Sequence, residues 1–294
     1  MGTIELKKSP SITQIEYEQG LQFRVGSLDK EADLEEAVQI IKYGGFVACQ
    51  MRGVFGIWVS GHDASAVQEA LLAKGSNLNK PLSTMLPAHK FLPLIDLESV
   101  VQPFQEIVQN VDQFRNRLGS MCHIRAPIKH SEIRNIPRSI LSNENGRYYI
   151  HNLDPYGHRP MEKMIDLLNT KGIKYVAVTS LNDNSINEPE IHDTRRAIEF
   201  SLETGVIPLL LIDPTHKRHE AIGSFAIIDF EQGTAIRDGN IPVKVIEKLL
   251  EVEIDISVMK ESRYKLKADF SHLLELELSP DKLRSAIIDY LSGN

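Results

Sequence analysis

Apolar residues recur along most of the chain in short strand-like runs, separated by segments in which they return every three to four positions. Residues 31–43 show this helical spacing and predict an amphipathic helix, which the glycines at 44 and 45 end before an apolar strand at 46–52. Further helices are predicted at 65–74, 105–118 and 161–170, and further strands at 122–125, 173–179, 206–212 and 223–230. Strands that alternate with helices in this way predict an α/β fold with one sheet flanked by helices.

Two segments interrupt this alternation. Residues 128–160 are rich in Asn, Pro, Arg and Tyr, which predicts an irregular excursion. Beyond about residue 250 leucines alternate with acids, and Ser279-Pro280 begins a short helix, which predicts a covering hairpin and helix packed on the main domain or on a second subunit. The predicted division is an N-terminal arm (1–24), a main domain (25–248) and a C-terminal appendage (249–294).

Composition favours a soluble globular protein. The chain has 294 residues, of which 42% are hydrophobic and 25% charged, so it can bury a large core. It has no apolar run long enough to cross a membrane and no apolar signal core at its start. Cys49 and Cys122 lie in apolar strand patterns, which indicates buried thiols in a reducing compartment. We therefore expect a cytoplasmic protein without a membrane partner.

Short motifs follow one another in a definite order. Val-Phe-Gly-Ile occupies 54–57, Lys-Pro-Leu occupies 80–82, and Ser-Leu-Asn occupies 180–182. Lys74 ends a predicted helix, and the remaining motifs are His-Ile-Arg-Ala-Pro at 123–127 and Ile-Arg-Asp-Gly at 236–239. In order and spacing these motifs resemble the YrdC-like family, the threonylcarbamoyl-AMP synthases and their paralogues, over roughly residues 25–248.

The resemblance implies a twisted, open mixed sheet with a concave basic site that binds ATP or AMP, with ATP accompanied by Mg²⁺. Lysines would face the phosphates, the Ser-x-Asn pair would hydrogen-bond the nucleotide, and arginines would complete the positive field. The nucleotide-binding residues implied in this way are Lys74, Lys80, Ser180, Asn182, Arg125 and Arg237. No cluster of His, Cys and acidic residues predicts a resident metal site.

The sequence departs from the family pattern where the amino acid would bind. The family's Pro-Thr-x-Thr reads Gln-Met-Arg-Gly at 50–53, and its Lys-x-Arg reads Lys-Gly-Ser at 74–76, so that Ser76 replaces the arginine. Phe225 replaces a hydroxyl residue. The loss of an arginine removes a planar donor fork suited to phosphate. The degenerate amino-acid pocket would comprise Met51, Arg52, Gly53 and Phe55.

Arg52 has two interpretations. In the first, Arg52 supplies on one wall of the pocket the positive charge that is missing at Ser76 on another wall. Strand alternation points Arg52 away from the face of Met51 unless a turn or bulge redirects it. The alternative is an arginine that is buried against an acid or exposed at the rim, with threonine activation lost.

Charge is unevenly distributed. The net charge is −7, yet residues 115–147 contain seven basic residues and two acids, a surplus of five positive charges. Such a segment beside a nucleotide pocket predicts contact with a triphosphate or with RNA, including double-stranded RNA or tRNA. Pairing of these arginines with acids elsewhere in the chain is an equally supported alternative.

Three hypotheses follow. The first is a divergent protein that binds nucleotide, with RNA as a partner, and no longer makes threonylcarbamoyl-AMP efficiently. The second is an active nucleotidyltransferase that forms a carbamoyl-adenylate from ATP, bicarbonate and an amino acid, in tRNA modification or biosynthesis. The third is a non-catalytic assembly partner, and a homodimer is compatible with all three. Pyrophosphate release would indicate the second hypothesis, and nucleotide binding without turnover would indicate the first. The absence of both binding and release would indicate the third.

Overall fold

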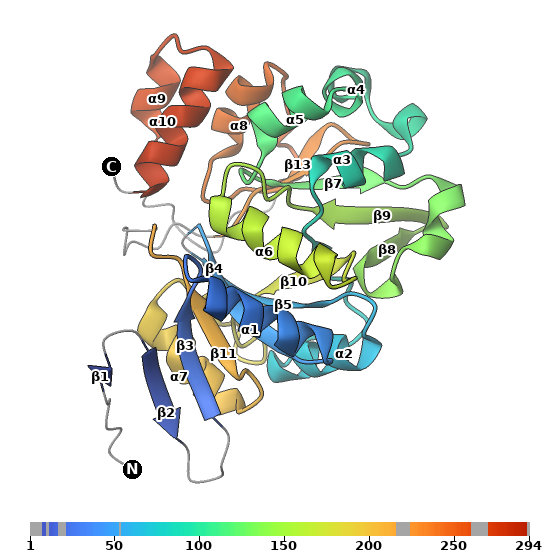
Figure 1. Ribbon diagram of the computed structural model, residues 1–294. Helices are drawn as coiled ribbons and strands as arrows, with labels where there is room; N and C mark the ends of the chain where they lie inside the picture. Colours follow the sequence, from blue (N-terminus) through green and yellow to red (C-terminus); the bar gives the residue numbers. More distant parts are fainter. Residues whose placement is uncertain are drawn as a thin grey trace.

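The computed structural model describes residues 8–9, 12–16, 22–52, 54–215, 224–259 and 270–292, and all described strands belong to one mixed sheet (Figure 1). The strands are β1 (Lys8–Ser9), β2 (Ile12–Glu16), β3 (Gln22–Ser27), β4 (Phe46–Met51), β5 (Val54–Ser60), β6 (Ser83–Thr84), β7 (His123–Pro127), β8 (Leu141–Glu144), β9 (Arg147–Asn152), β10 (Val176–Ser180), β11 (Leu209–Ile212), β12 (Ile227–Asp229) and β13 (Thr234–Arg237). Their spatial order is β1-β2-β3-β11-β4-β5-β10-β6-β9-β7-β12-β13, and β8 pairs with β9 outside that path. The predicted α/β class with a mixed sheet and flanking helices is confirmed.

Helices cover both faces of the sheet. They are α1 (Glu31–Lys42), α2 (Ala64–Ala73), α3 (Ala88–Phe91), α4 (Gln102–Gln109), α5 (Val111–Leu118), α6 (Arg159–Thr170), α7 (Thr194–Thr204), α8 (Val243–Leu250), α9 (Ser271–Glu275) and α10 (Pro280–Ser292), with 3₁₀ turns at Leu92–Leu94, Leu97–Ser99, His130–Asn135 and Arg138–Ile140. The apolar faces of α1 and α6 share one core cluster with Val47 and Cys49 of β4, whereas Phe46 and Ala48 belong to the cluster on the opposite side. Alternate residues of a strand therefore supply two separate cores.

The strands around β5 determine where the candidate site lies. β4 and β10 both pair with β5 in antiparallel fashion, with Cys49 opposite Gly56 and Gly56 opposite Ser180. Two strands that are each antiparallel to a third run parallel to each other, so Met51 and Ser180 end their strands at the same edge of the sheet. Neighbouring strands are about 4.8 Å apart, so the two strands are separated by roughly 10 Å.

Three element predictions were wrong. Residues 128–160 are not irregular, because they contain the hairpin β8–β9, whose turn residues Asn145 and Gly146 have φ of 54° and 84°. An Asn-Gly pair with positive φ at both positions is the sequence signal of a two-residue hairpin, and the Asn- and Pro-rich composition obscured it. The single helix predicted at 105–118 is two helices, since Asn110 is extended and its side chain accepts a hydrogen bond from Gln113 N (2.9 Å). The predicted hairpin near residue 275 is the short helix α9.

The C-terminal residues pack on the rest of the chain. Helix α10 lies against α5 and α8 (Figure 1), and its apolar residues Leu283, Ile287 and Leu291 are buried in the larger core cluster. The domain boundaries themselves stay a prediction, and most of the predicted arm 1–24 lies outside the described residues. Among the described helices, none combines the length and apolar character required to cross a membrane.

Candidate functional site

Lys74, Ser180 and Asn182 lie together in one hydrogen-bonded network. Lys74 is the C-terminal cap of α2 and is only 1% exposed, with its ammonium turned inward. Its Nζ donates to Thr179 Oγ1 (2.9 Å), to Ser180 Oγ (3.2 Å) and to the Ser180 carbonyl. Ser180 Oγ in turn donates to Asn182 Oδ1 (2.7 Å). Residues about a hundred positions apart in the sequence thus form one group.

The network continues into the two loops that frame it. Asn182 Nδ2 donates to Asn184 Oδ1 (2.8 Å), and the Asn184 backbone N–H donates to the Lys74 carbonyl (2.8 Å). Asn184 Nδ2 also donates to the hydroxyl of Ser76. Gly75 turns the chain between the lysine and Ser76 with φ of 59°, a region that favours glycine. Ser76, which stands where the family has an arginine, therefore joins the two loops.

The Lys74 ammonium is electrostatically unfavourable in this setting. Burial and the positive charge of Lys80 together lower the pKa of Lys74 to about 7, although Glu190 opposes the shift. Lys80 itself is exposed. At neutral pH the site therefore holds an amine that is close to losing its proton, which is typical of functional sites.

Buried His123 and half-buried His151 experience the same positive field. Burial, together with the charges of Arg125, Arg237 and Lys80, lowers the pKa of His151 to about 4. Burial, together with Arg237 and His151, lowers the pKa of His123 to about 3. Both imidazoles are therefore neutral at pH 7 and provide hydrogen-bonding groups without charge.

The two predicted arginines make strong contacts within the protein. Arg125 forms ion pairs with Asp229 (2.5 Å) and Glu144 (2.6 Å), and its guanidinium lies 3.5 Å from the centroid of the Tyr149 ring. Arg237 donates to Ser224 Oγ (3.0 Å) and to the Phe225 carbonyl (2.7 Å). Two acids therefore balance Arg125, and its predicted contribution to ligand binding stays a prediction.

Apolar side chains fill the positions predicted for the amino-acid pocket. Met51 (5% exposed) and Phe225 (2%) are buried in the same core cluster, and Phe55 is fully buried. A Cβ added at Gly56 would lie 2.2 Å from Met51 Cε and 3.1 Å from the Thr179 carbonyl oxygen. Met51 thus covers Gly56 directly beside the residues that bind Lys74. Gly53 lies outside the described residues.

Arg52 is buried in the turn after β4, and its contacts differ from both earlier interpretations. Its guanidinium donates to Ser120 Oγ (3.0 and 2.7 Å) and to the Gly157 carbonyl (2.9 Å). The residue is 5% exposed and has φ of 42°, so strand alternation does not determine its direction. Arg52 is therefore buried, as the second interpretation predicted, but its hydrogen-bond partners are a hydroxyl and a backbone carbonyl and not an acid.

The fold matches solved structures. A structure of P. abyssi Sua5 in complex with L-threonine aligns with 79% of this chain at 20% identity and a TM-score of 0.59, and a double variant of P. abyssi Sua5 aligns with 79% at 20% identity and a TM-score of 0.57. T. kodakarensis HypF aligns with 70% of this chain at 19% identity and a TM-score of 0.51. Sua5 is a YrdC-family protein.

The chain has the YrdC-like fold.

This YrdC-like chain covers only part of those proteins. It spans 60–62% of the length of the two Sua5 chains and 24% of the HypF chain. No protein-family model and no curated protein matches the sequence. The likeness therefore extends to the fold alone.

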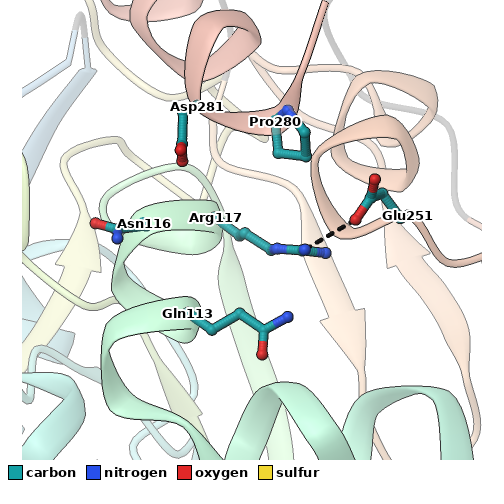
Figure 2. Close-up of a pocket in the computed structure, with 6 residues that line it drawn as sticks. All are labelled: Gln113, Asn116, Arg117, Glu251, Pro280 and Asp281. Atoms are coloured by element: carbon teal, nitrogen blue, oxygen red, sulfur yellow. Dashed lines mark hydrogen bonds and ion pairs between the residues drawn. The ribbon is translucent and has the colours of Figure 1, made fainter.

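A small polar hollow lies elsewhere on the YrdC-like fold (Figure 2). It measures about 240 Å³, between α5, the end of α8 and the start of α10, and Arg117 crosses it to Glu251 (2.8 Å). Its lining residues are Gln113, Asn116, Arg117, Glu251, Pro280 and Asp281. None of the predicted nucleotide-binding residues lines it.

Five of the basic residues in segment 115–147 have partners in the protein. Besides Arg125 and Arg117, Arg147 pairs with Glu231, Arg115 contacts His89 Nδ1 (2.8 Å), and Lys129 donates to the Pro93 carbonyl (2.8 Å). Arg134 and Arg138 are exposed, and no acid of the described part of the chain lies within ion-pair distance of them.

The sequence patterns did not identify His123, His151, Thr179 or Glu190 as neighbours of the predicted basic residues. His123 was detectable in principle, since it is two residues before Arg125 in a strand and therefore on the same face. His151 could not be found while 128–160 was interpreted as irregular. Within the described ranges no three His, Cys, Asp or Glu side chains are grouped as metal ligands.

Proposed function

We propose that this protein binds a nucleotide through the Lys74–Ser180–Asn182 network and does not activate threonine. The observation that carries the proposal is the convergence of Lys74, Lys80, His151 and Arg237 from separate elements, at a place where burial and neighbouring positive charges lower the pKa values of Lys74 and His151. A bound phosphate would reverse that penalty, because an anion stabilises the protonated amine.

Hydrogen-bonding groups support a nucleotide more than a simple anion. The hydroxyl of Ser180, the amide of Asn182 and the neutral imidazoles of His123 and His151 are uncharged donors and acceptors suited to ribose and base edges. Mg²⁺ would arrive with the ATP phosphates, since Mg²⁺ is commonly held through substrate phosphates and one or two carboxylates.

The volume and apolar character of the side chains at the predicted amino-acid pocket disfavour a bound amino acid. L-threonine is the ligand named for one P. abyssi Sua5 structure. In this chain Met51 covers Gly56, and Phe225 is buried in the same apolar cluster. A zwitterionic amino acid placed among these side chains would lose hydration without polar partners, which costs several kcal/mol. Threonine activation is therefore disfavoured.

Calorimetry with ATP and AMP tests the binding proposal. Lys74→Met should weaken ATP binding by about 2 kcal/mol, roughly 30-fold, because one charge-assisted contact to phosphate is lost. Lys42→Met, at an exposed lysine on α1, is the matched control and should leave the affinity unchanged. Equal ATP affinity in all three proteins would remove Lys74 from the site.

Pyrophosphate release separates this proposal from the alternatives. With ATP and bicarbonate, the wild type should show no threonine-dependent release. Release would establish the active carbamoyl-adenylate enzyme, whereas the absence of both binding and release would leave the assembly partner.

RNA binding is a second candidate, favoured by one observation. Arg134 and Arg138 are exposed, and Leu82 N donates to the Ser139 carbonyl (2.7 Å), so these arginines lie next to the loop that carries Lys80. A double change of Arg134 and Arg138 to Gln should weaken binding of a short RNA duplex and lower its salt dependence. Unchanged binding and an unchanged salt slope would exclude this surface.

A further inference from the structure

Unpartnered buried polar atoms gather around the loop 154–157, away from the Lys74 network. Asp154 Oδ2, Arg115 Nε and Arg284 Nε are buried without a hydrogen-bond partner among the described residues. Asp154 is 3% exposed. Buried polar groups are almost always paired with protein, water or a ligand, so this concentration requires an explanation.

Two arginines from distant parts of the chain lie beside this loop. Within the described residues, Arg52 donates to Ser120 Oγ and the Gly157 carbonyl. Arg284 of α10 donates to the carbonyls of Gly119 and Tyr156 (both 3.3 Å). In the described structure neither guanidinium forms an ion pair with an acid.

The nearby acids act on these two charges through space. Asp213 receives hydrogen bonds from His158 Nε2 (2.7 Å) and from the backbone and hydroxyl of Thr215 (2.9 and 2.6 Å). Burial raises the pKa of Asp154 to about 6, so at pH 7 this carboxyl is still mostly ionised and its Oδ2 remains an unpartnered acceptor. Burial and the charge of Arg284 lower the pKa of Arg52 to about 10. Arg52 and Arg284 are therefore neighbouring, partly buried positive charges that feel Asp213, Asp154, Glu162 and Asp281 through space, without an ion pair to any of them.

The backbone holds this arrangement in an unusual conformation. Arg52 (φ 42°) and Ser120 (φ 55°) both adopt left-handed conformations that L-residues rarely use, and a hydrogen bond joins their side chains. Gly157 also has positive φ (81°), and a Cβ there would lie 2.1 Å from Arg284 Nη2. Conformations of this kind persist where the surrounding structure imposes them, often at ligand sites.

We propose that Arg52 and Arg284 hold an oxyanion, a carboxylate or a phosphate group, beside the loop 154–157. Guanidinium groups suit both kinds of oxyanion, because their planar donors form paired charge-assisted hydrogen bonds. This second ligand site does not depend on nucleotide binding at Lys74. Its arginines come from the turn after β4 and from α10, so the ligand would join the main sheet to the C-terminal residues.

Asp154 adds a selectivity. Its unpartnered Oδ2 accepts a hydrogen bond, so among tetrahedral oxyanions the site should prefer one that carries a donor, as hydrogen phosphate does and sulfate does not. Hydrogen phosphate should therefore bind better than sulfate, which has similar shape and charge.

Thermal shift and calorimetry with inorganic phosphate, sulfate and acetate test the site. The Lys74→Met protein is the background, so that binding at the Lys74 network does not contribute. Added phosphate should raise the melting temperature of this protein, and introducing Arg284→Gln should weaken phosphate binding on the order of tenfold or more. Arg195→Gln, at an exposed arginine of α7, should leave the response unchanged.

Each outcome is informative. A response to phosphate indicates a phosphate-bearing ligand, and a response to acetate alone indicates a carboxylate. Arg284→Lys keeps the charge and should retain part of the response, which distinguishes lost binding from lost folding. The absence of a response to both phosphate and acetate, or an equal response after Arg284→Gln, would overturn the proposal. Sulfate that binds as tightly as phosphate would overturn the role of Asp154. Loss of ATP binding in Lys74→Met with an intact phosphate response would support both sites separately.

Discussion

The buried ammonium of Lys74 predicts a specific dependence of stability on pH. A lysine has an ordinary pKa of 10.5, and the pKa of Lys74 in the folded protein is about 7. Between these values the unfolded chain binds more protons than the folded one, so the free energy of unfolding should rise with pH. Below pH 7 both states are protonated, and the penalty of the buried charge is fully present.

The magnitude follows from the two pKa values. Each pH unit over which only the folded state has lost the proton is worth about 1.4 kcal/mol. From pH 7 to pH 9 the folded state loses the remaining half of its proton while the unfolded state keeps nearly all of its own, so the gain is about 2 kcal/mol. Lys74 is 1% exposed, so solvent screening does not reduce this figure substantially.

Denaturant unfolding of the wild type and of Lys74→Met at pH 7, 8 and 9 measures this effect. The difference between their free energies of unfolding should shift by about 2 kcal/mol in favour of the wild type over this range. Comparison with the variant cancels the other titrating groups. A difference that stays constant with pH would show that Lys74 remains fully charged, and would refute the electrostatic reasoning for the site.

Three further outcomes are expected. ATP binding at pH 8 should take up close to one proton, because phosphate restores the ammonium of Lys74; calorimetry in buffers of different ionisation enthalpy measures this, and zero uptake would contradict it. Asp229→Asn should lower the free energy of unfolding by about 3 kcal/mol, since it leaves the buried Arg125 with one exposed acid; an effect under 1 kcal/mol in denaturant unfolding would oppose this view. Gly146→Ala should cost about 1 kcal/mol through its φ of 84° alone, because nothing lies within 4 Å of the added Cβ; an unchanged melting temperature would contradict this.

Much of the fold was predictable because local patterns and the final packing agree. Helix α1 ends where the glycines at 44 and 45 predicted, and β4 is buried on both faces, as its continuous apolar run suggests. Lys74, Ser180 and Asn182 could be assigned to one place because motif order determines which strand ends meet. The hairpin β8–β9 was missed because composition was weighed above its Asn-Gly turn.

The side-chain environment of the site was less accessible from sequence. Nothing local to Arg52 shows that its partner is Ser120, which is 68 positions away, or that Arg284 approaches from α10. The pKa of Lys74 likewise depends on Lys80 and Glu190, which reach it only in the folded chain. Burial and through-space charge are tertiary properties, and a pattern of residue types does not contain them.

The packing of α10 has a consequence for synthesis of the protein. Leu283, Ile287 and Leu291 complete a core cluster that also contains apolar residues of α5 and α8, about 170 and 40 positions earlier in the chain. On the ribosome those earlier residues emerge first and expose an apolar surface until residues 283–291 follow. Chaperone demand should therefore persist until residues 283–291 have been synthesised, and a stop codon near residue 275 should produce aggregation during synthesis more than a loss of ligand affinity.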